Sequence, residues 1–128
     1  MFIENKSKFS FEETIEKLAK AVGKSDWKMI HTHDLQQLMH KNGHEVLFAK
    51  VMEICAPLFA FKLLSEDDER IYSNMMPCRL SVYEKSDGKT YVSRMNIEQF
   101  ASKMGGVIQE VISTAFKGAE GFIDQVIE

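Results

Sequence analysis

The sequence predicts an α+β fold, a two-layer sandwich in which helices pack on a mainly antiparallel sheet. Three observations carry this prediction: an amphipathic helix near the N-terminus, a β-hairpin at about residues 79–95, and a C-terminal helix. An antiparallel hairpin among mixed elements favours this class over a doubly wound parallel sheet. The 128 residues contain no linker-like or repeated segment. We therefore expect a single domain, residues 1–128.

The first helix is expected to begin after Ser10 and to end at Gly23. Ser10 and Glu13 have the spacing at which a hydroxyl and a carboxylate cap each other's free amide groups. Apolar side chains then recur every three or four residues, and glycine is a common helix end. Aromatic and β-branched residues next predict a strand over 27–32.

The middle of the chain alternates between the two element types. A short helix is predicted after Asp34, and the apolar run 45–55 predicts a strand buried on both faces, with a helix as the alternative. Proline suits the first turn of a helix, so a buried helix is expected over 57–64. The acidic run 66–69 is expected to be loop.

The hairpin and the final helix are the clearest predictions in the second half. The Asp87-Gly88 pair tolerates the positive φ angles of a tight turn, and pairing about it places Tyr83 opposite Val92. An apolar stripe after residue 96 predicts the last helical tract. The adjacent glycines Gly105-Gly106 lower helix propensity by about 2 kcal/mol and predict a break in this tract.

Composition excludes several function classes. A net charge of −3, from 16 basic and 19 acidic residues, offers no cationic surface for phosphate backbones, so we expect no nucleic acid partner. The longest apolar stretch, 54–64, is too short for a bilayer and is interrupted by Pro57 and Lys62, so no membrane association is expected. Two cysteines and no signal-peptide pattern indicate a cytoplasmic protein.

Several short motifs along the chain share a pattern with a known family. The matching residues are Ser10, Glu12, Glu13, Asp34, Cys55, Pro57, Pro77, Cys78, Val82, Tyr83, Glu84, Asp87 and Gly88. With these residues the chain resembles the domain-of-unknown-function family DUF302 over roughly residues 9–116, which implies a compact α+β fold and dimers, without an established activity. Two positions depart from the family pattern: Ala56 replaces an asparagine, and Gly105-Gly106 interrupt an alanine-rich helix.

The candidate ligand or thiol site consists of Cys55, Pro57, Pro77, Cys78 and Glu84. Each cysteine lies beside a proline at a predicted strand boundary, where a side chain can reach a cleft. Two alternatives stay open for the cysteines. They are small buried residues of the core, or they are reactive thiols stabilised by a helix N-terminus.

A metal site is a further hypothesis. His31 and His33 are two residues apart on a predicted strand, so both imidazoles should share one face with Trp27 and Met29. Together with Cys55 and Cys78, and with Met75 or Met76, they would form a soft ligand set for zinc or copper.

No familiar catalytic motif occurs, so a binding protein is favoured over an enzyme. We expect a cytoplasmic homodimer that binds a small ligand or a protein partner. Apolar residues near the C-terminal end, namely Phe116, Phe122 and Ile123, are expected to remain uncovered in one copy. The alternative function is a metal-binding or thiol-redox site built from Cys55 and Cys78 with His31 or His33.

Overall fold

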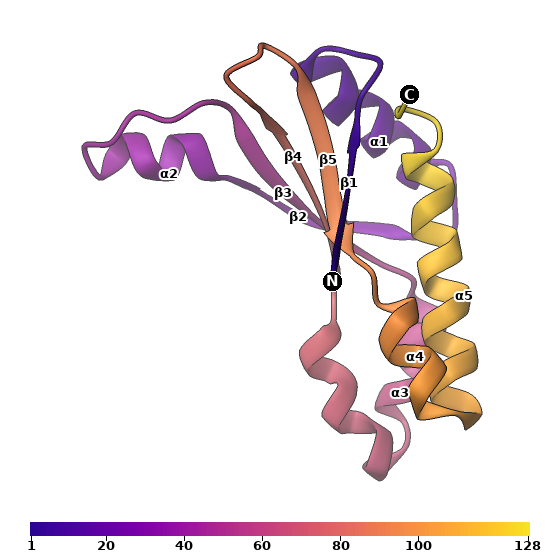
Figure 1. Cartoon of the computed structure of the whole chain (residues 1–128). Coiled ribbons are helices and arrows are strands. Elements are labelled where there is room, and N and C mark those ends of the chain that lie inside the picture. The colour runs from indigo at the N-terminus through magenta and orange to yellow at the C-terminus, as the bar shows by residue number, and fades with distance from the viewer.

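The computed structural model describes all 128 residues and contains one five-stranded antiparallel sheet in the order β1-β5-β4-β3-β2. Helices α1 and α5 lie along one face of this sheet, whereas the other face is open (Figure 1). The predicted α+β architecture is confirmed. The strands are β1 (Phe2–Lys6), β2 (Lys28–Asp34), β3 (Ala49–Cys55), β4 (Cys78–Glu84) and β5 (Thr90–Met95). The helices are α1 (Phe11–Gly23), α2 (Leu35–Lys41), α3 (Pro57–Leu64), the 3-10 helix η1 (Asp67–Met75), α4 (Glu98–Met104) and α5 (Gly106–Ile123).

Local sequence signals explain where the helices start and stop. The Ser10 hydroxyl accepts the amide of Glu13 at the start of α1, and the Asp34 carboxylate accepts the amide of Gln37 at the start of α2. The expected break in the C-terminal tract is present, because Gly105 has a φ of 69° and separates α4 from α5. The acidic run, predicted to be loop, instead begins η1.

The hairpin between β4 and β5 forms, but its predicted register is wrong by one residue. Tyr83 pairs with Tyr91, and Val82 pairs with Val92. The predicted register requires a two-residue turn, whereas the turn has three residues and Gly88 adopts a φ of 77° as its last member. This geometry is typical of a type I turn followed by a glycine bulge.

Strand β2 also departs from the predicted pattern. Met29 pairs with Ile54 and His31 pairs with Glu53, so Ile30 has no partner and forms a β-bulge. The bulge reverses the alternation of side chains. Met29 and Trp27 therefore pack against the core, whereas His31 and His33 are exposed, and the prediction that all four share one face is wrong.

Strand β3 is shorter and less buried than expected. It begins at Ala49, and only Met52 and Ile54 on one side of it are buried. The apolar residues 46–48 precede the strand and are exposed. The prediction of burial on both faces fails because no second layer covers the open face of the sheet.

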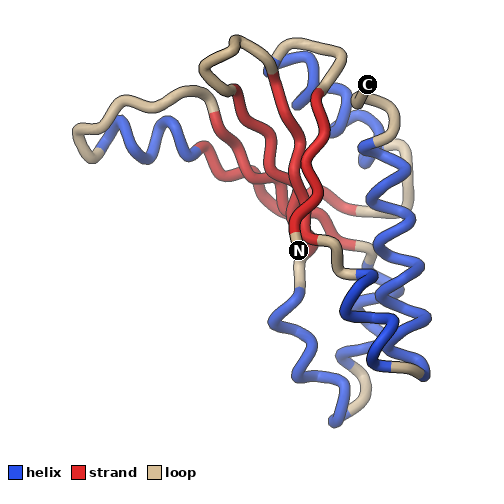
Figure 2. The backbone as a smooth tube through the Cα atoms, in the orientation of Figure 1, coloured by secondary structure: helices blue, strands red, loops and turns tan.

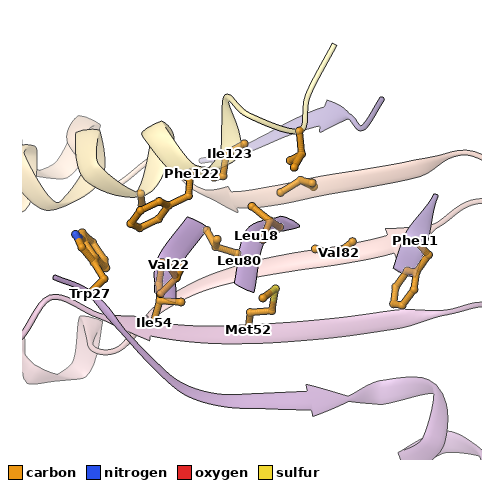
Figure 3. Close-up of a cluster of buried hydrophobic side chains, with 13 residues drawn as sticks. Phe11, Leu18, Val22, Trp27, Met52, Ile54, Leu80, Val82, Phe122 and Ile123 are labelled. Carbon is orange, nitrogen blue, oxygen red and sulfur yellow. The ribbon is translucent and has the colours of Figure 1, made fainter. Parts of the chain in front are cut away.

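The main core lies between the sheet and helices α1 and α5 (Figure 3). Leu18 and Val22 of α1 meet Met52, Ile54 and residues of β4 and β5 in a cluster of 13 buried residues. A smaller core of five buried residues joins α3, α4 and the first half of α5: Leu63, Ala101, Ile108, Val111 and Ile112. Helix α5 therefore belongs to both cores, and we call the part built by α3, η1, α4 and the start of α5 the lower unit (Figure 2).

Candidate functional site

The candidate site is an apolar cavity at the junction between the sheet and the lower unit. Its volume is about 60 Å³, and its wall contains no charged side chain. Strand ends contribute Ile54 and Cys78, helix α3 contributes Phe59, and helix α5 contributes Ile112. The other lining residues are Trp27, Cys55, Ala56, Ala60, Leu63, Tyr72, Met75, Met76, Pro77, Ile97, Val111 and Ala115.

The chain reaches this cavity through two proline-containing connections. Cys55 ends β3, and Pro57 then begins α3. Pro77 follows η1, after a cis peptide bond from Met76, and Cys78 begins β4. Because β3 and β4 pair with Ile54 opposite Cys78, both connections meet at the same end of the sheet.

Three of the five predicted site residues line the cavity, and two do not. Cys55, Pro77 and Cys78 lie in its wall. Pro57 is exposed and only starts the helix whose later residues form the wall. Glu84 is at the opposite end of β4, about 20 Å away at the rise of an extended strand.

The protein environment keeps both thiols protonated. Burial, with a smaller contribution from the charge of Cys55, raises the pKa of Cys78 to about 11. Burial also raises the pKa of Cys55. Both cysteines are free. Because the nucleophilic form is the thiolate, this environment favours packing over thiol reactivity at neutral pH.

The two candidate histidines lie elsewhere, on the open face of the sheet. Their rings are 4.4 Å apart, and His33 Nε2 is 2.6 Å from Glu53 Oε1. The hydrogen bond from His33 is the main reason why the pKa of Glu53 is lowered. No group of three or more His, Cys, Asp or Glu side chains is arranged to hold a metal ion. The structure thus separates the proposed ligand set into a histidine pair and a cysteine pair.

A second cavity of about 240 Å³ shares a wall with the apolar one, including Met76, Pro77 and Cys78. Arg94 and Glu120 line it and form a partly buried ion pair. Arg94 Nη2 is 2.6 Å from Glu120 Oε1, Nε is 2.8 Å from Oε2, and Nη1 donates to Asn5 Oδ1 at 2.6 Å. This pair ties β1 and β5 to α5 directly beside the candidate site.

Most of the apolar wall was missed by reasoning from the sequence. Trp27, Phe59, Ile97 and Ile112 come from four separated segments, and nothing in their local spacing shows that they meet. The only local signals that bear on the cavity wall are the two helix starts, at Pro57 and after Gly105. Both helices were expected, but their meeting at one strand end was not.

The family model for DUF302, a domain of unknown function, matches residues 3–127. The chain belongs to the DUF302 family. A crystal structure of an uncharacterized conserved DUF302 protein from Bacillus stearothermophilus has a similar fold, with a TM-score of 0.83. The two sequences are 18% identical, and the match covers 96% of this chain and 95% of the other. A comparison with curated proteins found no match.

The family match extends the resemblance from roughly 9–116 to almost the whole chain, so both the edge strand β1 and the end of α5 lie within the DUF302 domain. The structural likeness to the Bacillus protein supports the fold alone. None of the helices has the length and apolar character needed to cross a membrane.

Proposed function

We propose that this DUF302 domain is a homodimeric module that binds a small apolar molecule, or the apolar end of a larger one, without catalysis of its own. The observation that carries the proposal is the cavity at the junction of the two cores, where 15 of the 16 lining residues are hydrophobic. Apolar walls with few polar groups are typical of small-molecule sites.

The size of the cavity limits the ligand. A volume of 60 Å³ open to the centres of water molecules corresponds to roughly five waters. That is the space of one benzene-sized ring or of a short branched acyl chain. Catalysis is disfavoured because the only ionisable side chains in the wall are two cysteines and Tyr72, and the pKa of Cys78 is raised to about 11.

A thiol or metal function is the second candidate. What supports it is that Cys55 and Cys78 line one cavity. What weakens it is their raised pKa values and the absence of any group of three or more His, Cys, Asp or Glu side chains that could hold a metal ion. Two free thiols also support our inference that the protein works in the reducing cytoplasm.

The test is a benzene titration followed by thermal unfolding and by methyl NMR spectra. Ligand at ten times its Kd should raise Tm by about 5 °C for a chain of this length. The methyl signals of Ile97, Val111 and Ile112 should shift, and those of Val82 and Val92 in the main core should not. No rise in Tm, or shifts confined to other methyl groups, would reject the proposed site.

A matched pair of variants on α5 gives the control. Ala115→Leu places three extra carbon atoms in the cavity wall and should abolish the benzene effect. Thr114→Leu places the same side chain on the exposed neighbouring position and should preserve the benzene effect.

Titration of the two thiols and elemental analysis of the purified protein test the thiol or metal function directly. Rapid modification at neutral pH or a bound metal would favour it.

A further inference from the structure

The connection between β2 and β3 projects from the sheet as a separate arm. We define the arm as residues 34–48, which contain α2 and the return segment to β3. Figure 1 shows it extending away from the sheet, on the side opposite to α5. Not one residue of α2 is buried, in contrast to α1 and α5.

The arm is internally ordered although none of its residues is buried. Gln36 Nε2 donates to the carbonyl oxygen of Val46 at 3.1 Å, which joins the helix to the return segment. At the tip, His40 Nδ1 is 2.6 Å from Glu45 Oε1. At the root, the Phe48 ring stacks on Phe11 with 5.0 Å between centroids. The arm is thus a preorganised hairpin of helix and extended chain.

The exposed side chains of the arm include several large apolar ones. Leu38 is 49% exposed, Val46 43% and Leu47 51%. A seven-residue helix is marginal in water without packing, because isolated helices shorter than about 12–15 residues have little stability. Packing of α2 against a further surface would therefore stabilise it.

The accessible surface of the chain is larger than one compact copy should have. It measures 7935 Å², whereas a monomer of 14.7 kDa is expected to expose about 6,900 Å². The excess of about 1,000 Å², to which the arm and the lower unit both contribute, is of the same size as the roughly 800 Å² that each partner contributes to a stable interface. The lower unit is also exposed, but it has a core of five buried residues, and the arm has none of its own.

We propose that the occupant of this surface is a second copy of the chain, and that the two arms clasp reciprocally about a two-fold axis. This inference rests on the homodimer of the proposed function and names its interface. Most assemblies of identical chains are dimers with a two-fold axis. In such a dimer, the same arm of both copies would form the interface. The clasp buries Leu38, Val46 and Leu47.

The experiment is sedimentation velocity on the full chain and on two double variants. The arm variant is Leu38→Glu with Leu47→Glu. The control is Leu58→Glu with Val107→Glu, which adds the same charges at apolar positions of the lower unit that are 74% and 57% exposed. Because all four positions are exposed in one copy, circular dichroism should show that both variants remain folded.

We expect a dimer for the unmodified chain and for the control. In the arm variant, the affinity between the two copies should fall by about thirty-fold or more for each central leucine replaced. A further variant replaces residues 36–48 with Asn-Gly, which places Leu35 opposite Ala49 in continuation of the Asp34–Lys50 pairing and joins β2 to β3 directly. It should be a folded monomer. An unmodified chain that is monomeric at high micromolar concentration overturns the clasp. So does an arm variant or an armless chain that stays dimeric, or a control that dissociates instead.

The benzene titration separates this proposal from the ligand site. A monomeric chain that still binds benzene would refute the clasp and leave the cavity as the binding site. A dimer held by the arms that does not bind benzene would refute the cavity and support the clasp.

Discussion

The partly buried ion pair between Arg94 and Glu120 allows a quantitative test of how much a charge pair beside the cavity contributes to stability. The perturbation is Arg94→Met, which keeps the length and apolar character of the side chain but removes the guanidinium. Arg94 is 7% exposed and makes three short hydrogen bonds, two to Glu120 and one to Asn5. The change leaves the Glu120 carboxylate, only 22% exposed, without its counter-ion.

Removing one partner of such a pair typically destabilises a protein by about 3–5 kcal/mol, because a buried charge is left uncompensated. For 128 residues, the entropy of unfolding converts this destabilisation into a decrease in Tm of about 10–20 °C. The double variant Arg94→Met with Glu120→Leu should recover most of the stability, since an apolar pair of similar volume replaces both charges without desolvating either. Only Asn5 is then left without its partner, at about 1–2 kcal/mol.

The assay is urea and thermal unfolding of the four proteins in the double-mutant cycle, followed by circular dichroism. Glu120→Leu should stabilise the protein when residue 94 is already methionine. It should destabilise the protein when Arg94 is present. Two results would contradict this reasoning. One is a destabilisation below about 1 kcal/mol for Arg94→Met, and the other is a double variant as unstable as the two single changes added together.

Three further predictions use other parts of the structure. Gly118→Ala should destabilise the protein by about 1–3 kcal/mol, because its Cβ would lie 2.9 Å from Trp27 Cζ2. The control is Gly121→Ala on the same helix, whose Cβ would meet nothing within 4 Å and which should raise the free energy of urea unfolding by up to about 1 kcal/mol. Equal effects of the two substitutions would show that the Trp27 ring moves aside. Because the pKa of Cys78 is raised to about 11, its modification by iodoacetamide should be slow at pH 7 and increase about tenfold per pH unit up to pH 10; a plateau near pH 8 would refute the burial argument. Hydrogen bonds from Lys85 and Tyr83 lower the pKa of Glu4, so its contribution to stability is present above pH 4.5 and disappears as the pH falls through the folded-state pKa. Glu4→Gln should therefore make acid unfolding less steep, with Glu12→Gln as control, and identical curves would show that these hydrogen bonds have no role in solution.

The sequence was sufficient for most of the elements, because their signals are local. Ser10 with Glu13, Asp34 with Gln37, and Pro57 each specify a helix start through groups within one turn, and all three helices begin there. The paired glycines likewise break the C-terminal tract as expected. The family resemblance was confirmed by the match of the DUF302 model to residues 3–127.

Register and burial were not predictable in the same way. The hairpin register depends on whether the Asp87-Gly88 turn has two or three residues, and both choices fit the same sequence. The bulge at Ile30 has no local marker, yet it decides on which face the histidines lie.

The sequence also did not predict which apolar residues are exposed. Phe122 and Ile123 were expected to be uncovered, but they are buried under the sheet, and Phe116 is half-buried. Several of the apolar residues that are exposed belong to the arm, where their pattern predicts part of a strand. Burial is decided by which segments meet across the fold, and that information is not present in the spacing of one segment.

Helix α5 joins two parts of the fold that differ in the amount of buried apolar surface. Its C-terminal half belongs to a cluster of 13 buried residues, and its N-terminal half belongs to a cluster of only five. Local opening requires less free energy where less apolar surface must be exposed. We therefore expect the lower helices to open locally more readily than the sheet, and amide exchange should be faster in α3 and α4 than in β4 and β5.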